Sequence, residues 1–264
     1  VLLSSTLHDP RGVFLDSIQH AGRVVLENYR GWVVNVTTTT DTRVKDALRA
    51  LAPEGVYMTE TDTQHPIVSD KVENDHLYLL EQTAAIAKEL GVSKIQYTDG
   101  DRVITAAEHY PDDLRKLARN VSASLKEQGT YINFRRSIED YASHHPPLMQ
   151  TEFEFNCLYT EAFGMPIDIG STCHGISFDV LQEILKESPE MEQVSFPHPK
   201  WLLIAKEMGA SIASQETKNV LTFETPDQFK EQTGEGTTYD ETQARYMNTL
   251  GRDSTVAPKE WALR

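Results

Sequence analysis

The sequence predicts an α/β fold with a mostly parallel central sheet flanked by helices. The first third of the chain alternates short apolar or β-branched runs with longer segments of helical periodicity. Strands that are joined through helices pair in parallel, because a parallel neighbour requires a crossover connection. The 264 residues also suffice to bury the core of one large α/β domain.

Strand and helix patterns follow one another in chain order. Residues 13–29 have the apolar spacing of an amphipathic helix, Gly31 ends it, and 32–37 is a β-branched run. Asp41 or Thr42 is placed to cap the next helix. The segments expected as strands are 1–6, 32–37, 56–59, 94–98, 130–134, 211–214 and 220–223. The segments expected as helices are 13–29, 44–51, 74–90, 111–126, 151–163, 180–186 and 201–208, with Pro146 and Pro147 interrupting the chain before 151.

Composition narrows the function classes. A formal net charge of −15 repels phosphate backbones and argues against nucleic-acid binding. No apolar run approaches the roughly 18 residues that span a membrane, and the start of the chain lacks the basic region of a signal peptide. The two cysteines, Cys157 and Cys173, form neither a disulfide framework nor a zinc motif. We therefore expect reduced, buried thiols in a cytoplasmic protein, with a homo-oligomer left open.

Two aspartates separated by one glycine follow the predicted strand at 94–98. Asp99 and Asp101 would emerge at the carboxyl end of this strand, where open α/β sheets bind ligands. Two carboxylates there suit Mg²⁺ or Mn²⁺ carrying a diphosphate, and Gly100 would let the backbone pass close to such a ligand. The alternative is a solvated turn from strand to helix, in which Asp and Gly are common.

No Gly-x-Gly-x-x-Gly follows the first strand, and no Walker-type loop is present, which argues against a dinucleotide-dependent oxidoreductase and a P-loop NTPase. The order of features instead resembles family-2-like glycosyltransferases of the GT-A fold, closest to poorly characterised bacterial and archaeal members. The pieces that carry the resemblance are Val33-Val34-Asn35-Val36-Thr37, Asp99-Gly100-Asp101, Gly170-Ser171-Thr172-Cys173-His174-Gly175-Ile176-Ser177, Pro199-Lys200-Trp201-Leu202-Leu203 with Met208-Gly209, and Phe223-Glu224-Thr225.

The resemblance implies a GT-A-like, Rossmann-like catalytic domain over 1–225, with a nucleotide-binding half at 1–110 and an acceptor half at 111–225 that holds a small acceptor-side subdomain. A loop or tail at 226–264, with a short helix near 243–250, would follow. Such an enzyme moves a sugar from a UDP- or GDP-linked donor to an acceptor hydroxyl, with Mn²⁺ or Mg²⁺ held by Asp99 and Asp101.

Residues at two loops are expected to hold the nucleoside. Thr6 and His8 close the first strand, and the hydroxyls of Thr37 and Thr38, with the nearby Asp41, close the second. The alternative is that Thr37 only extends its strand and Asp41 only caps a helix.

Two basic residues and Asp99 are expected at the diphosphate. Arg102 would reach a phosphate, or would instead pair with Asp99 or Asp101. Lys71, expected just before the long helix, would lie near the diphosphate or be an ordinary solvated lysine.

Candidates for catalysis are Arg136, His174 and His198. Paired arginines at the end of a strand suggest an anionic acceptor, although an ion pair between Arg136 and Glu139 or Asp140 is the alternative. Either histidine could act as a base or a third metal ligand. The resembled family usually carries an acidic pair just before the position of Trp201, where this chain has none.

Two other functions stay open. The missing acidic pair suits a non-catalytic nucleotide-sugar-binding protein on the same fold. A sugar-phosphate nucleotidyltransferase also uses carboxylates and Mg²⁺, but it usually needs a Gly-rich N-terminal loop with a basic residue, which 4–9 does not supply.

Overall fold

The computed structural model describes residues 1–61, 69–126, 128–144, 146–188 and 197–222, with 69–74 and 146–151 described by backbone alone. The expected Phe223-Glu224-Thr225 strand end, the tail at 226–264 and the helix near 243–250 lie outside the described residues.

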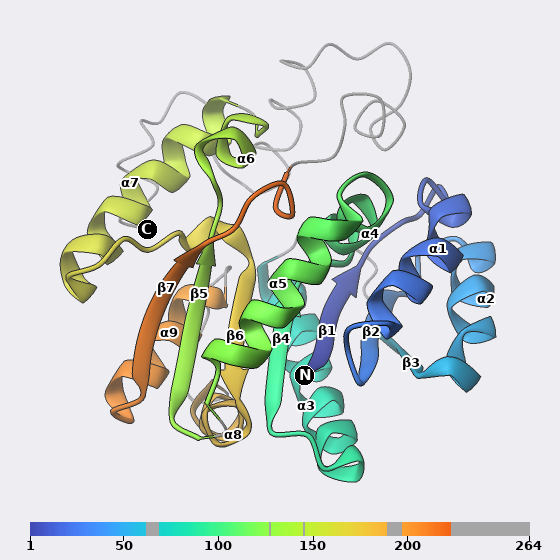
Figure 1. The fold of residues 1–264 in the computed structure, drawn as a ribbon, viewed down its shortest axis with the longest axis horizontal. Helices are drawn as coiled ribbons and strands as arrows, with labels where there is room; N and C mark the ends of the chain where they lie inside the picture. The colour runs from blue at the N-terminus through green and yellow to red at the C-terminus, as the bar shows by residue number, and fades with distance from the viewer. Residues whose placement is uncertain (62–68, 127, 145, 189–196, 223–264) are drawn as a thin grey trace.

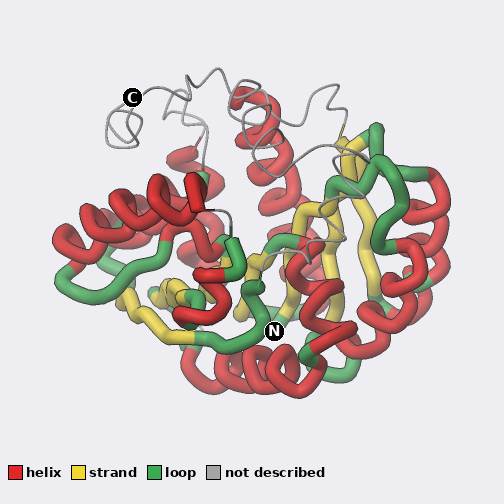
Figure 2. Tube along the Cα trace, turned by 90° about the horizontal axis from the view of Figure 1, so that it is seen from above, coloured by secondary structure: helices red, strands yellow, loops and turns green. Residues whose placement is uncertain are grey.

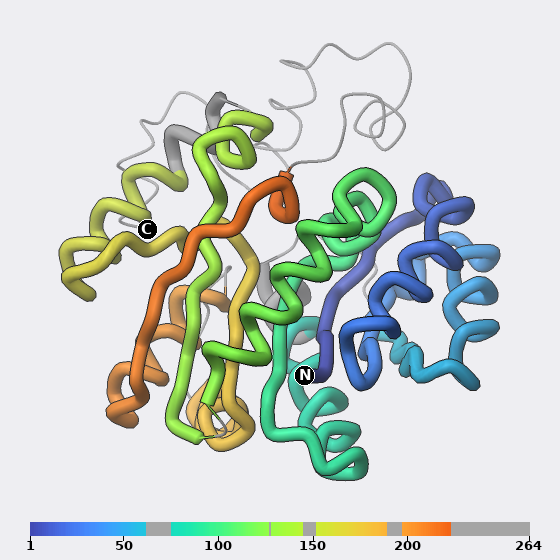
Figure 3. Tube along the Cα trace, in the orientation of Figure 1, coloured from blue at the N-terminus to red at the C-terminus, as the bar shows by residue number. Residues whose placement is uncertain are grey.

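The described residues form one seven-stranded sheet in the order β3-β2-β1-β4-β6-β5-β7 (Figure 1). Its strands are β1 (Leu2–Leu7), β2 (Gly31–Thr37), β3 (Val56–Thr61), β4 (Lys94–Thr98), β5 (Thr130–Arg135), β6 (Cys173–Ser177) and β7 (Ser211–Glu216). Only β6 runs antiparallel to its neighbours β4 and β5, and the other paired strands are parallel. The predicted mostly parallel sheet is confirmed, with β3 and β7 as its two edges (Figure 3).

Helices cover both faces of the sheet (Figure 2). They are α1 (Leu15–Leu26), α2 (Thr42–Ala50), α3 (Ser69–Leu90), α4 (Gly100–His109), α5 (Pro111–Ser124), α6 (Ile138–Ala142), α7 (Pro146–Phe163), α8 (Phe178–Glu187) and α9 (His198–Glu207), with short 3₁₀ turns η1 (Ala52–Glu54) and η2 (Ile169–Ser171). Helices α1, α2, α4 and α5 pack into one hydrophobic cluster, and α3, α8 and α9 pack into a second cluster on the opposite face.

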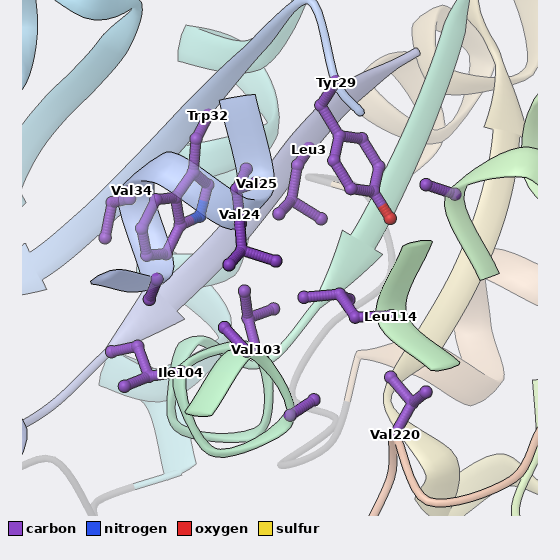
Figure 4. Close-up of a cluster of buried hydrophobic side chains, with 14 of the residues drawn as sticks. Leu3, Val24, Val25, Tyr29, Trp32, Val34, Val103, Ile104, Leu114 and Val220 are labelled. Atoms are coloured by element: carbon purple, nitrogen blue, oxygen red, sulfur yellow. The ribbon is translucent and has the colours of Figure 1, made fainter. Parts of the chain in front are cut away.

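The alternation of side chains along each strand sorts the core between these two faces. Leu2 belongs to the cluster under α3, whereas the next residue, Leu3, belongs to the cluster under α1 and α4. In the cluster under α1 and α4, Trp32 of β2 lies beside Val25 of α1 (Figure 4). The indole of Trp32 donates a 2.6 Å hydrogen bond to Ser5 Oγ, so its one polar atom is satisfied in the core.

The structure corrects four expectations about the elements. Pro146 begins α7 instead of interrupting the chain, because proline is tolerated in the first turn of a helix. Helix α4 follows Asp99 directly, and the sequence analysis assigned no helix there. Helix α3 begins at Ser69, five residues earlier than expected, so it contains Lys71. The described part of the expected strand at 220–223 is not a strand.

Gly100 lies where α4 approaches β1. A Cβ atom on this residue would stand 2.8 Å from the carbonyl oxygen of Thr6 and 3.1 Å from the Cβ of Leu7. The glycine therefore permits a close approach between two parts of the chain, where the sequence analysis had expected close passage to a ligand.

Candidate functional site

A small pocket opens at the carboxyl ends of β1 and β2, beside α3. Its volume is about 110 Å³, and its lining residues are Thr6, Leu7, His8, Asn35, Thr37, Asp75 and His76. Three of the residues expected to hold a nucleoside, Thr6, His8 and Thr37, therefore meet at one place. The Nδ1 atom of His8 lies 2.8 Å from Thr37 Oγ1, which joins the two loops.

The rest of the polar pocket lining comes from Asn35, Asp75 and His76, none of which was predicted from the sequence as a site residue. Asn35 of β2 donates its amide to Thr61 Oγ1 at 3.1 Å and accepts from Thr59 Oγ1 at 2.9 Å. Asp75 of α3 is 8% exposed, and burial raises the pKa of its carboxyl, while a hydrogen bond from Thr61 and the charge of His76 oppose the rise. The one indication of this part of the pocket in the sequence is Asn35, a polar residue inside a β-branched run. The helical pattern alone did not show that Asp75 and His76 face the same edge.

A group of three side chains that could hold a metal ion adjoins the pocket. One ligand atom each from His76, Asp99 and His198 lies within 4.8 Å of the others. His76 comes from α3, Asp99 is the N-cap of α4 and His198 is the first residue of α9. We call these three residues the cation group. His76 also lines the pocket, so the two features share a wall.

Tyr97 of β4 contacts all three members of the cation group. Its hydroxyl donates a hydrogen bond of 3.0 Å to Asp99 Oδ1 and lies 3.3 Å from Thr6 Oγ1 in the pocket wall. Its ring centroid is 5.0 Å from that of His198 and 5.7 Å from that of His76. Burial, with the nearby charge of Asp99, raises the pKa of Tyr97 well above its usual value, so the hydroxyl stays protonated and can donate.

His198, a member of the cation group, and the neighbouring His174 are both buried. Burial is the main cause that lowers the pKa of His198 well below its usual value, and the charges of His174, His76 and Arg102 act in the same direction. Its imidazole is therefore neutral near pH 7, the form that binds a metal ion.

His174 of β6 lies among aromatic side chains, with its ring centroid 5.1 Å from that of His198 and 5.5 Å from that of Tyr131. It is 0% exposed, and neither of its ring nitrogens has a hydrogen-bond partner among the described residues. Burial lowers the pKa of His174 to about 3, so it stays neutral. In this structure it has no surface to offer a substrate.

The second aspartate of the motif behaves differently from the first. Asp101 lies in the first turn of α4, and its Oδ1 accepts a hydrogen bond of 2.8 Å from the backbone N–H of Arg102. It is not in the cation group. Arg102 is buried, donates from Nη1 to the carbonyl oxygen of Ser171 at 3.1 Å, and has its Nε 3.9 Å from Asp99 Oδ2. Of the two options from the sequence, the structure shows Arg102 beside Asp99.

Arg136 takes part in a buried ion network. Its guanidinium bonds both carboxylate oxygens of Asp168, at 2.8 and 2.6 Å, and Glu152 Oε2 at 2.6 Å. The partners are thus neither Glu139 nor Asp140, the alternatives from the sequence. The side chain of Arg136 is 0% exposed, and the network ties the end of β5 to α7 and to the turn before β6. The structure does not bring Arg136 to the pocket or the cation group.

Thr38 and Asp41 are not among the described residues that line the pocket. The carbonyl oxygen of Thr38 accepts a 2.9 Å hydrogen bond from Lys45 Nζ. Asp41 caps α2 and pairs through both oxygens with Arg43, whose hydrogen bonds lower the pKa of Asp41 to about 2. This is the capping role that the sequence left as the alternative. The side chain of Lys71 lies outside the described residues.

Two further expectations concern the state of the cysteines and the presence of membrane-spanning helices. Both cysteines are free; Cys173 is buried as expected, but Cys157 on α7 is exposed. Among the described residues, no helix is both long and apolar enough to cross a membrane.

Comparison with known proteins identifies the fold of the chain. No family model matches the sequence, and a search of curated proteins finds no similar sequence. Among solved structures, the chain is similar to glucosyl-3-phosphoglycerate synthase from Mycobacterium tuberculosis in complex with Mn²⁺, UDP and phosphoglyceric acid. The TM-score is 0.50 at 11% identity, over 96% of this chain and 79% of that chain.

The complex of the same synthase with Mn²⁺, UDP and glucosyl-3-phosphoglycerate also gives a TM-score of 0.50, at 10% identity, over 96% of this chain and 81% of that chain. A protein described only as mycobacterial gives 0.50 at 10% identity, over 96% of this chain and 75% of the other. At such identities the likeness is one of fold. The seven mostly parallel strands flanked by helices are therefore the Rossmann-like GT-A fold of glycosyltransferases.

Proposed function

We propose that this protein is a metal-dependent glycosyltransferase that moves a sugar from a nucleotide-diphosphate donor to an acceptor hydroxyl. One observation carries the proposal: a pocket at the carboxyl edge of the sheet adjoins a group of three metal-binding side chains, and His76 belongs to both. A nucleoside diphosphate has the same two-part design, with a base and ribose next to an anion that binds divalent cations.

The three side chains of the cation group suit a divalent metal ion. Bonds of about 2 Å to one ion place opposite ligand atoms about 4 Å apart, close to the 4.8 Å limit within which these atoms lie. Two imidazoles favour a transition-metal ion over Mg²⁺, which prefers oxygen ligands. Among these ions we propose Mn²⁺, which also takes carboxylate oxygen ligands, held by Asp99, His76 and His198. Mn²⁺ and UDP are also what the crystals of the similar synthase contain.

A bound cation would supply positive charge to the departing nucleotide diphosphate. That charge matters in a chain whose net charge is −15, which would otherwise repel an anionic donor. Tyr97 holds the Asp99 carboxylate in position through its hydrogen bond. Thr6 and Thr37 line the pocket, where they would contact the nucleoside. A phosphate contact from Arg102 or Lys71, and a role for Asp101 in metal binding, stay predictions.

The acceptor side of the site concerns Arg136 and His174. The roles suggested for Arg136 and His174 at the acceptor side stay predictions, and both side chains are fully buried in the structure. Helix α7, the ion network of Arg136 and the turn before β6 belong to the half of the chain expected to bind the acceptor. A cytoplasmic location and a homo-oligomer also stay predictions.

The test is isothermal titration calorimetry of the purified full chain with UDP, with and without Mn²⁺. We expect UDP affinity to rise at least tenfold with Mn²⁺, and this gain to disappear in Asp99→Asn, which keeps the size of the side chain. Asp112→Asn, which changes an exposed carboxylate of α5, is the matched control and should keep the gain.

Slow hydrolysis of UDP-glucose or another UDP-sugar in the presence of Mn²⁺ would then identify a transferase. Metal-enhanced UDP binding with no hydrolysis and no transfer to a broad acceptor panel would favour the non-catalytic nucleotide-sugar-binding protein. If neither Mn²⁺ nor the Asp99→Asn change altered the affinity for UDP, the proposal would be refuted.

A further inference from the structure

One buried histidine has polar atoms that neither the fold nor the proposed function uses. His174 of β6 is 0% exposed, and neither of its ring nitrogens has a hydrogen-bond partner among the described residues. A neutral imidazole carries one hydrogen-bond donor and one acceptor, and burying each without a partner costs free energy. Such atoms are rare in folded proteins, so His174 requires a reason other than packing.

The ring beside His174 belongs to the cation group. The ring centroids of His174 and His198 lie 5.1 Å apart, and the angle between the ring planes is 30°. A hydrogen bond of about 3 Å between two imidazole nitrogens places the ring centres about 5 Å apart, because each nitrogen lies about one ångström from its ring centre. The two rings therefore have the spacing of a hydrogen-bonded pair.

Only the orientation of the rings separates them from such a pair, since no hydrogen bond joins His174 to His198 in this arrangement. The last side-chain torsion of a histidine is broad, so its ring turns at little cost. A turn of the His174 ring in its own position would direct a nitrogen towards His198.

Binding of a cation would create a donor that needs this partner. A neutral imidazole that binds a metal ion through one nitrogen carries its hydrogen on the other. The rings that pack against His198 are His76, Tyr97, Trp201 and His174. His76 would bind the ion, Trp201 offers only a donor, and the hydroxyl of Tyr97 is engaged by two other side chains. Among these four rings, His174 is the one with an acceptor nitrogen to offer.

We propose that His174 is a positioning residue of the cation group, and that it accepts a hydrogen bond from the ring N–H of metal-bound His198. This inference rests on the proposed function, because it concerns the cation of that site. The hydrogen bond would hold the ring of His198 in the tautomer and orientation that bind the ion. It would also give a partner to a buried nitrogen that the fold leaves without one.

The proposal predicts that one substitution acts differently on stability and on metal binding. His174→Phe removes both ring nitrogens and keeps an aromatic ring. Loss of buried polar atoms without partners does not destabilise a core, so the melting temperature without added metal should stay the same or rise. The dissociation constant for Mn²⁺ should nevertheless rise by about 10–100-fold. His174→Leu repeats the test with a side chain that does not crowd the site.

The experiment is isothermal titration calorimetry of the full chain with Mn²⁺ alone, with thermal unfolding of each variant to check that it is folded. His174→Gln and His174→Asn provide the rescue, because their amide oxygens can accept a hydrogen bond from His198. At least one of these amide variants should bind Mn²⁺ more tightly than both apolar variants. Tyr131→Phe is the matched control. It removes another buried polar atom without a partner among the described residues, and it should leave the affinity for Mn²⁺ unchanged.

The outcomes separate this inference from the proposed function. If the unaltered protein does not bind Mn²⁺, or if Asp99→Asn binds it equally well, the proposed cation site fails and this inference fails with it. If Mn²⁺ binding depends on Asp99 but the folded apolar variants of His174 bind Mn²⁺ as tightly as the unaltered protein, the proposed function stands and the positioning role is wrong.

Two further results would overturn the positioning role of His174. Equal losses of Mn²⁺ affinity in the apolar and the amide variants would mean that packing is the cause, because the amides can still accept a hydrogen bond. Loss of the fold in both apolar variants would contradict the proposal as well, because removal of polar atoms without partners should not destabilise the core.

Discussion

The hydroxyl of Tyr97 donates a 3.0 Å hydrogen bond to the carboxylate of Asp99, two residues further along the chain. Tyr97 belongs to β4, and Asp99 is the N-cap residue of α4. The hydrogen bond therefore fixes the carboxylate relative to the strand. Groups that hold metal ligands in position commonly change metal affinity by about 10–100-fold when removed.

Replacement of Tyr97 by Phe should therefore weaken Mn²⁺ binding by about 10–100-fold while the protein stays folded. The readouts are the Mn²⁺ dissociation constant by calorimetry and the melting temperature. Tyr131→Phe is the matched control, since the Tyr131 hydroxyl is equally buried and has no hydrogen-bond partner among the described residues. Equal Mn²⁺ affinity in Tyr97→Phe and the unaltered protein would show that the bond does not position Asp99.

Replacement of Arg136 by Met should destabilise the fold by about 3–5 kcal/mol, because it leaves the buried carboxylates of Asp168 and Glu152 without their cation. Urea unfolding, followed by circular dichroism, gives the change in the free energy of unfolding. Arg43→Met breaks an ion pair whose arginine is exposed, and it should leave the free energy of unfolding almost unchanged. Similar small losses in both variants would contradict the structural role given to the Arg136 network.

Replacement of Gly100 by Ala should cost about 1–3 kcal/mol, because the new methyl group would overlap the backbone carbonyl of Thr6, which cannot move without disturbing β1. The measurement is again urea unfolding. Gly22→Ala in α1 offers a contrast, since the new atom meets only the side-chain end of Leu51, and alanine favours a helix by up to about 1 kcal/mol over glycine. If Gly22→Ala cost as much as Gly100→Ala, backbone crowding would not be the cause.

Because His144 is buried, we expect the free energy of unfolding to fall in mild acid. Burial is the largest cause that lowers the pKa of His144 to about 2, and the charges of Arg102 and Arg136 add to it. In the unfolded chain a histidine takes up its proton below about pH 6.5. The unfolded state then binds more protons than the folded state, so this contribution to stability is complete above pH 6.5 and is lost as the pH falls towards 2.

Between pH 6.5 and pH 4.5, each unit should cost up to about 1.4 kcal/mol on account of this one residue. His144→Gln should flatten the dependence by that amount, measured as the free energy of urea unfolding at several pH values. His109→Gln, at an exposed histidine of α4, serves as the control. An unchanged slope in His144→Gln would mean that His144 is protonated in the folded protein.

The sequence predicted most of the half of the sheet that carries the pocket. Its four strands are β1 to β4, which have clear β-branched or apolar runs and are separated by helices, so the parallel pairing followed from connectivity alone. The same argument placed Thr6, His8 and Thr37 together, because the carboxyl ends of parallel neighbours meet at one edge. Asp99 was found because it follows a strand directly.

What the sequence could not predict depends on distances between elements. His76 and Asp75 lie within α3, and only the packing of that helix on the sheet turns them towards the edge. The carboxylate partners of Arg136 are Asp168 and Glu152, 32 and 16 positions away, whereas the expected partners, Glu139 and Asp140, are near neighbours in the sequence. Asp101 looked equivalent to Asp99 in a linear motif, but α4 begins at Gly100, so the two carboxylates occupy different positions around the first turn of a helix.

The shared position of His76 has a thermodynamic consequence. Because His76 lines the pocket and belongs to the cation group, a nucleotide in the pocket and a cation in the group would each act on this one side chain. By reciprocity of coupled binding equilibria, whatever factor the nucleotide adds to cation affinity, the cation adds to nucleotide affinity. The two ligands would then be taken up as a cooperative pair, and each would leave more readily once the other has gone.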